Sequence, residues 1–149
     1  MRIAQDRMTF DTTPREIKEI TRDLAEWTAR QGVVSGLLSV FIRHTSASLL
    51  IQENYSPDVR RDLETFLDRL APEDPSRYRH NDEGPDDMPA HLKAMLTQVT
   101  LTIPGMEARL QLGTWKGVFP AGAPRPAASP RAGPDADRRV SRGSRGQCF

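Results

Sequence analysis

The residues of this chain best suited to chemistry are its three histidines. His44, His80 and His91 each lie in a polar stretch, and none stands alone on an apolar face. Three imidazoles converging on one point would suit a divalent transition metal, or an acid and a base working near neutral pH. Their spacings of 36 and 11 residues form no local metal motif. Separate histidines on surface loops are therefore the alternative.

Further polar groups flank these histidines. Glu53 and Asn54 follow a short predicted strand, where they would add a carboxylate and an amide to a site or form only a polar turn. Thr45 and Ser46 offer hydroxyl and backbone N–H groups for an anion, although such residues are also ordinary turn material. The sequence thus predicts a compact polar site without naming its substrate. Three acidic residues are interpreted as solvated and not catalytic: Asp62, Asp86 and Asp87.

Composition limits the classes of protein to which the chain can belong. Its 149 residues fit one domain that needs no disulfide, and the single cysteine, Cys148, favours a reducing compartment. No stretch reaches the roughly 20 apolar residues of a membrane span, and the start of the chain lacks the apolar run of a secretory signal. We therefore expect a cytoplasmic protein without a membrane partner.

The charge is distributed unevenly. Residues 1–119 hold 15 Lys and Arg against 18 Asp and Glu, so this part carries a net charge of −3 and the remainder +4. A mixed, slightly acidic body has no basic stripe that could follow a nucleic-acid backbone. We do not expect nucleic acid as a ligand.

The first third of the chain predicts a strand, a helix and a second strand. Residues 2–10 alternate loosely as a strand does, and Thr13 is suited to cap a helix that runs to about residue 30. Gly32 supplies the stop. The uncharged, β-branched and aromatic-rich run 33–42 is expected to form the sheet centre, covered on both faces.

The remainder of the body continues this mixture. A short strand at 48–51 precedes a helix that begins at Ser56 and Pro57. The helix has an apolar stripe that is expected to be buried: Val59, Leu63, Phe66, Leu67 and Leu70. An acidic loop spans residues 73–87, and its length is typical of functional or mobile segments.

A third helix is predicted at 88–96 and an alternating strand at 99–103. Pro104 and Gly105 mark a turn, and further strand residues follow to Phe119. Strands and helices interleave without a βαβ repeat or a glycine-rich phosphate loop. The pattern therefore predicts an α+β fold.

Residues 120–149 differ from the body, because fifteen of the thirty are Pro, Gly or Ala. Such a segment buries too little apolar area to offset its ordering entropy, so we expect disorder from about Pro120. Back-translation read one nucleotide later permits a sequence that ends in a good β-strand. The tail is therefore a candidate product of a shifted reading frame, which the encoding DNA around codon 119 would decide.

Five segments together resemble the YjbQ family, known as secondary thiamine-phosphate synthases, over residues 1–119. They are HTSASLLIQEN at 44–54, DVRRDL at 58–63, RYRH at 77–80, EGPDDMPAHLKA at 83–94 and LGTWKG at 112–117. Their order and spacing make the combination specific, whereas each alone is weak. All three histidines fall on positions of these motifs.

The resemblance implies a homotrimer of α+β subunits built on antiparallel sheet, with a pocket near the subunit contacts. His44, His80, His91 and Glu53 are then expected to be the catalytic residues, with the three histidines as metal ligands. The residues expected to bind substrate are Arg43, Thr45, Ser46, Asn54, Lys93, Thr114 and Trp115.

The activity implied by the family joins a pyrimidine diphosphate to a thiazole phosphate and releases pyrophosphate. A divalent metal, Mg²⁺ or Zn²⁺, together with Lys93 and Arg43, would bind the leaving diphosphate. The alternatives are a non-catalytic module that binds a metal or a phosphorylated metabolite, and a non-functional frameshifted chain.

Three features depart from the family pattern. Lys116 stands where the GTWQ motif has Gln, Ala108 replaces a glycine, and the C-terminal strand pattern is missing. A strand that buries four large aliphatic side chains contributes roughly 6 to 10 kcal/mol, which is comparable to the stability of a whole domain. We therefore expect the missing strand to be the most serious departure.

Overall fold

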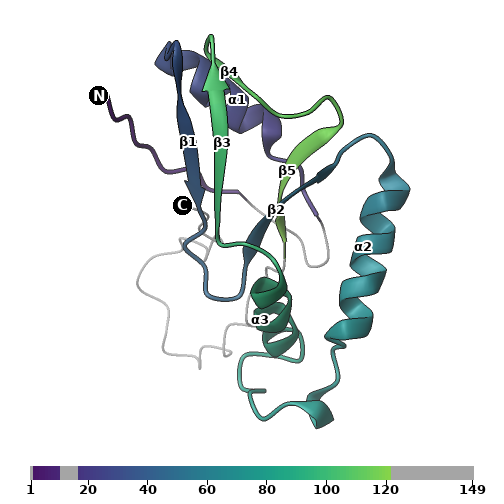
Figure 1. The fold of residues 1–149 in the computed structure, drawn as a ribbon. Helices are drawn as coiled ribbons and strands as arrows, with labels where there is room; N and C mark the ends of the chain where they lie inside the picture. The colour runs from purple at the N-terminus through teal and green to yellow at the C-terminus, as the bar shows by residue number, and fades with distance from the viewer. Residues whose placement is uncertain (1, 11–16, 122–149) are drawn as a thin grey trace, which may run out of the picture.

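The computed structural model describes residues 2–10 and 17–121, which form three α-helices, a short 3₁₀ helix and five strands (Figure 1). In chain order the elements are α1 (Thr21–Gln31), β1 (Ser35–Phe41), β2 (Ser48–Glu53), α2 (Pro57–Leu70), η1 (Pro75–Arg77), α3 (Asp87–Leu96), β3 (Thr100–Met106), β4 (Arg109–Leu110) and β5 (Lys116–Ala121).

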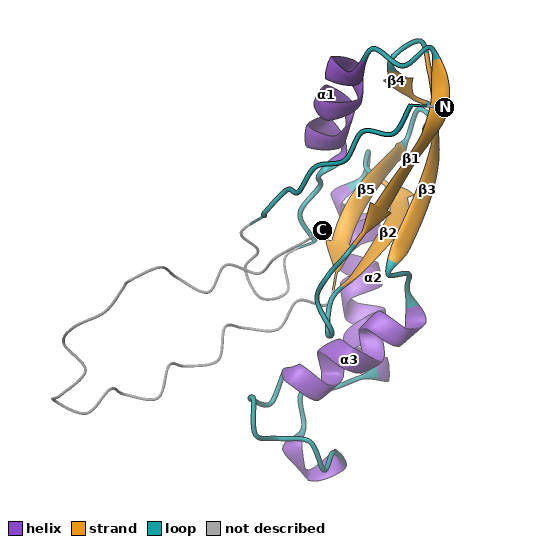
Figure 2. Ribbon diagram, turned by 90° about the vertical axis from the view of Figure 1, so that its left-hand side faces the viewer, coloured by secondary structure: helices purple, strands orange, loops and turns teal. Residues whose placement is uncertain are grey.

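The strands form two antiparallel sheets, with orders β1-β3-β4 and β2-β5. β1 pairs with β3 from Ser35 opposite Met106 to Phe41 opposite Thr100, and an isolated bridge between Leu49 and Gln98 links the two sheets. Figure 2 shows α1 beside one end of the strands and α3 at the other. The predicted α+β class with antiparallel sheet is confirmed.

The hydrophobic core lies between α1 and the strands. Ile20 and Leu24 from the α1 segment pack in one cluster with residues of β1, β3 and β5. β3 buries alternate residues, as expected for a strand that buries one face. The buried members of this core are Phe10, Ile20, Leu24, Val40, Ile42, Ala47, Leu49, Leu101, Ile103 and Val118.

The first helix starts later than predicted. Residues 17–20 are not helical and α1 begins at Thr21, while Thr13 lies outside the described residues. The Ile20 N–H donates to the Val118 carbonyl over 2.9 Å, and the Thr21 hydroxyl accepts from the Val118 N–H over 2.8 Å. The start of α1 is therefore set by hydrogen bonds to β5 and not by the predicted local cap. The predicted stop at Gly32 is confirmed by its left-handed φ of 60°.

Two surfaces expected to be buried are open in the described structure. β1 is an edge strand, not the sheet centre, and the side chain of Leu37 on its outer face is 74% exposed. The second helix occupies the predicted residues, with Ser56 as its cap, but none of its residues is buried and Phe66 is 57% exposed. The hydrophobic pattern of the sequence identified the apolar faces of both elements, but it did not indicate whether the same chain covers them.

Two smaller predictions were also wrong. Residues 2–10 form no strand, although Phe10 reaches the core. The turn lies at Glu107 and Ala108, because Pro104 and Gly105 belong to β3.

β5 reaches Ala121 and so includes the first two residues of the predicted tail. The rest of that tail, including the proposed frameshifted segment, lies outside the described residues. Within residues 2–10 and 17–121 no helix has the length and hydropathy of a membrane span.

Replacing Ala108 with glycine should stabilise the chain. Ala108 has a φ of 60°, a conformation that costs a residue with a Cβ roughly 1 kcal/mol and costs glycine little. We expect Ala108→Gly to raise the melting temperature by about 3 to 5 °C in calorimetry. The matched change Ala29→Gly, on the exposed face of α1, should lower the melting temperature. A decrease for both variants would contradict the assigned strain.

Candidate functional site

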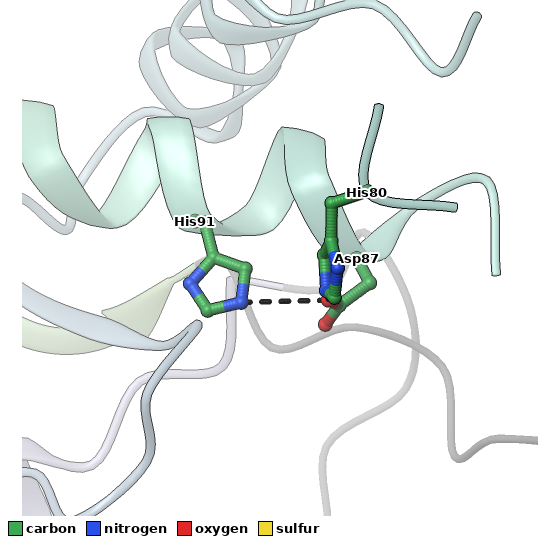
Figure 3. Close-up of side chains that lie close together, drawn as sticks. All are labelled: His80, Asp87 and His91. Atoms are coloured by element: carbon green, nitrogen blue, oxygen red, sulfur yellow. Dashed lines mark hydrogen bonds and ion pairs between the residues drawn. The ribbon is translucent and has the colours of Figure 1, made fainter. Parts of the chain in front are cut away.

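Two of the three histidines meet at one buried carboxylate (Figure 3). Asp87 Oδ2 lies 2.9 Å from His80 Nε2 and 3.4 Å from His91 Nε2, and the two rings are 5.9 Å apart in edge contact. Asp87 is only 4% exposed, whereas both imidazoles are partly open to solvent. The potential ligand atoms of the three side chains lie within 4.8 Å of one another.

The start of α3 positions two members of this cluster. Asp87 is the first residue of the helix, and His91 follows four residues later on the same face. Pro89 and Ala90 on the neighbouring face are buried, which fixes the rotation of the helix about its axis. The carboxylate and one imidazole are therefore oriented by helix packing.

The loop before α3 supplies His80. Its backbone is tied by side chains, because Asn81 Nδ2 donates to the Pro75 and Tyr78 carbonyls and Tyr78 Oη donates to the Pro72 carbonyl. Hydrogen bonds from Ser76 hold the pKa of Asp74 below its ordinary value and begin the 3₁₀ turn. His80 thus projects from an ordered loop.

His44 lies outside this cluster in the described structure. It belongs to the turn between β1 and β2, where its Nδ1 lies 3.2 Å from the Ser46 N–H and 3.3 Å from the Ser46 hydroxyl. Ser46 is itself almost fully buried, at 1% exposure. The structure therefore joins two of the three predicted histidines, and the role of His44 as a third ligand stays a prediction.

The cationic residues predicted to bind substrate differ in their surroundings. Lys93 Nζ donates to Asp68 over 2.5 Å, a bond that joins α3 to α2. Arg43 and Thr45 are exposed beside His44. Of the two predicted cations, Lys93 has a structural partner and Arg43 is open to a ligand.

The remaining predicted residues gather at the far end of β2. Asn54 Nδ2 donates to Glu19 Oε1, and the Asn54 N–H donates to the Trp115 carbonyl, both over 3.0 Å. Glu53 accepts from the Ser56 N–H before α2. A Cβ at Gly117 would come within 2.5 Å of Glu19 Oε1, so the second glycine of the LGTWKG segment allows this approach.

The residues around His44 and the residues around Glu53 lie at opposite ends of β2 within one chain. Thr114 and Trp115 are exposed near the end of β2 marked by Glu53, and the Trp115 ring makes edge contact with Tyr55 at 4.6 Å. The turn that carries His44 precedes the other end of β2. At about 3.3 Å per residue, a six-residue strand separates them by roughly 17 Å.

Sequence reasoning missed Asp87 as a member of the site. Asp87 was interpreted as solvated, yet it is buried beneath two imidazoles. The available signal was its spacing of four residues from His91, but the predicted helix began one residue too late to include it. Because helix boundaries are uncertain by one or two residues, the shared face was overlooked.

Comparisons with known families and proteins agree on one group. A family model described as UPF0047 protein YjbQ-like matches residues 6–140. The UPF0047 protein sll1880 of Synechocystis is 47% identical over 115 residues, covering 77% of this chain and 78% of its own length. The UPF0047 protein YjbQ of Salmonella typhimurium is 40% identical, covering 77% of this chain and 83% of its own.

Solved structures show the same fold. An uncharacterised conserved protein of the YjbQ/UPF0047 family from Clostridium acetobutylicum superposes with a TM-score of 0.70 at 31% identity, covering 78% of this chain and 88% of its own. A conserved hypothetical protein from Thermus thermophilus gives 0.68 at 37% identity, covering 77% and 86%. These names assign no activity.

Proposed function

The chain belongs to the YjbQ-like UPF0047 family, and we propose that it binds a divalent transition metal through His80, Asp87 and His91 in order to act on a phosphorylated small molecule. The observation that carries the proposal is the convergence of two imidazoles on one buried carboxylate. An ionised carboxylate removed from water needs a compensating charge or strong hydrogen bonds. A cation held jointly with the imidazoles would supply that charge.

The chemistry of these donors selects the kind of metal. Two imidazole nitrogens and one carboxylate oxygen, with further positions left for solvent or ligand, suit Zn²⁺ or another first-row transition ion. Mg²⁺ prefers oxygen ligands only, so of the two expected ions Zn²⁺ fits better. A metal bound here would supply a Lewis acid for phosphoryl oxygens.

Zinc titration tests the site. Isothermal calorimetry should show one zinc per chain, and His91→Ala or Asp87→Asn should weaken binding by about a hundredfold or more, because each removes a ligand. Acidification should also weaken binding, since protons compete for the imidazoles. Asp82→Asn changes an exposed acid of the same loop and should bind like the wild type. Equal zinc affinity in all four proteins would remove the proposal.

The finer proposal is a transfer of the thiamine-phosphate type. It rests on the family motifs and on the exposed Arg43 next to His44 in the sequence, which could bind an anion. In this reaction the carbon–oxygen bond to the diphosphate breaks, a carbon–nitrogen bond to the thiazole ring forms, and pyrophosphate leaves. A binding module for the same phosphorylated compounds, without turnover, uses the same residues.

An activity assay distinguishes the transferase from the binding module. With both precursors and Zn²⁺ or Mg²⁺, the wild type should form thiamine phosphate, and His80→Asn should lower the rate by about a hundredfold. Asp82→Asn again serves as the control. The same low rate in the wild type and in His80→Asn would eliminate the transferase and leave the binding module.

We further propose that the protein acts as a homotrimer. Leu37 and Phe41 of β1 are exposed in the described chain, and so are Phe66 and Leu70 of α2. Large open apolar patches usually mark interfaces. The predicted site residues also lie at opposite ends of β2. A neighbouring subunit would both cover these faces and bring one group of residues to the other.

Mass measurement in solution tests the assembly. Light scattering on the wild type should give three chains per particle, and Leu37→Glu or Phe66→Glu should shift the population towards monomer by placing a charge in an apolar interface. Thr65→Glu, at an exposed polar position of the same helix, should leave the mass unchanged. A monomeric wild type would contradict the proposal.

A further inference from the structure

We infer that His44 serves the site as a neutral hydrogen-bond donor through Nε2–H to an oxygen of the bound anion, and that it is not a metal ligand. The inference rests on the proposed function for the existence of that site. It assigns His44 a role different from the one predicted from the sequence. The carrying observation is the contact between His44 Nδ1 and the backbone N–H of Ser46 at 3.2 Å.

A backbone N–H can only donate, so this bond fixes the role of Nδ1 as an acceptor. The Ser46 hydroxyl, at 3.3 Å from the same nitrogen, can add a second donor. In the neutral imidazole the proton is then on Nε2. His44 therefore presents an N–H, and not a lone pair, at the outer edge of its ring.

Metal-binding histidines have the opposite arrangement. A ring that ligates through one nitrogen almost always donates the N–H of its other nitrogen to an acceptor. Ligation by His44 through Nε2 would need removal of both ring protons or loss of the bond from Ser46. His80 and His91 differ, because each directs its Nε2 at Asp87 and no described residue donates to its Nδ1. Their Nδ1 can therefore carry the proton while Nε2 ligates a metal.

The turn that holds His44 is anchored at both ends. The Ile42 N–H donates to the Val99 carbonyl over 3.0 Å, and Leu49 exchanges backbone hydrogen bonds with Gln98. The hydroxyl of Thr97 bonds to Ser48 over 2.5 Å. These contacts fasten the turn to the segment that directly follows α3, and both ribbon views show the two side by side. The geometry at Nδ1 is therefore set by the fold.

The outer edge of the His44 ring is available to a ligand. No described residue accepts a hydrogen bond from His44 Nε2, and the ring is partly exposed. The residues before and after it in the sequence, Arg43 and Thr45, are exposed. A neutral N–H donor, with a guanidinium and a hydroxyl on the two adjacent residues, suits a phosphate oxygen. The ligand class is thus a phosphate ester or diphosphate.

The first test determines the tautomer. Long-range proton–nitrogen NMR of ¹⁵N-histidine-labelled wild type should show His44 with Nε2 protonated and Nδ1 unprotonated, both without metal and with Zn²⁺ bound. Zinc should shift the nitrogens of His80 and His91 and leave those of His44 in place. A proton on Nδ1 of His44, or a zinc-induced shift of its Nε2, would overturn the inference. Because the metal-free spectrum alone fixes the tautomer, this test is independent of whether zinc binds.

The second test uses two variants of His44 that keep different parts of the ring. His44→Asn places an amide oxygen where it can accept from the Ser46 N–H but has no group at the Nε2 position, whereas His44→Gln can return an N–H to that position. Zinc affinity should stay within about twofold of the wild type in both. Affinity of the zinc-loaded protein for inorganic pyrophosphate should fall about tenfold in His44→Asn and be largely retained in His44→Gln.

The outcomes are distinct. Loss of zinc binding in His44→Asn as large as in His91→Ala would make His44 a ligand and overturn the inference. No pyrophosphate binding by the wild type, or equal affinity in His44→Asn, would overturn the role as donor. Absence of zinc binding by the wild type would instead refute the proposed metal site, and the metal-free tautomer would still decide the state of His44.

Discussion

The candidate site depends on one electrostatic constraint, the burial of the Asp87 carboxylate beneath two imidazoles. A carboxylate taken out of water is stable only when hydrogen bonds or a positive charge replace its hydration. In the described structure His80 makes a hydrogen bond to this carboxylate over 2.9 Å, and His91 Nε2 lies 3.4 Å from the same oxygen. Removing either ring would leave a buried acid partly unsatisfied, so the geometry of the loop, the helix start and the carboxylate must be kept together.

The fold meets this constraint through α3. Its buried face, with Pro89 and Ala90, fixes how the helix presents Asp87 and His91, while Lys93 joins the helix to α2. The residues that follow α3 pair with the start of β2 and hold the turn that carries His44. One helix thus relates all three histidine segments, although only two of the rings touch the carboxylate.

Local sequence patterns predicted the elements better than their surroundings. Helices α2 and α3 were placed within one residue by the Ser56-Pro57 cap and the apolar spacing. The late start of α1 was not predictable, because it results from hydrogen bonds between Ile20, Thr21 and Val118, nearly a hundred residues away. The exposure of β1 and α2 was also missed, since an apolar stripe does not tell whether the same chain or another subunit covers it.

For the candidate site, too, the sequence identified residues better than their spatial arrangement. The histidines were identified by residue type. Recognising Asp87 as part of the site needed the correct first residue of α3. Separating His44 from the other two histidines needed the geometry of its turn with Ser46. The resemblance identified the family, and the family comparisons confirmed it, whereas neither establishes a substrate. The described residues supply the donor atoms of the proposed metal site, and the phosphate chemistry is a separate proposal.

The most direct measurement of this account is X-ray absorption at the zinc edge of the zinc-loaded protein. The account predicts a first shell with two imidazole nitrogens at about 2.0 to 2.1 Å and oxygen ligands at about 2.0 to 2.2 Å. It also predicts that the imidazole contribution falls to one ring in His91→Ala and stays at two rings in His44→Asn. A shell without imidazole scattering, or with three rings in the wild type, would contradict it.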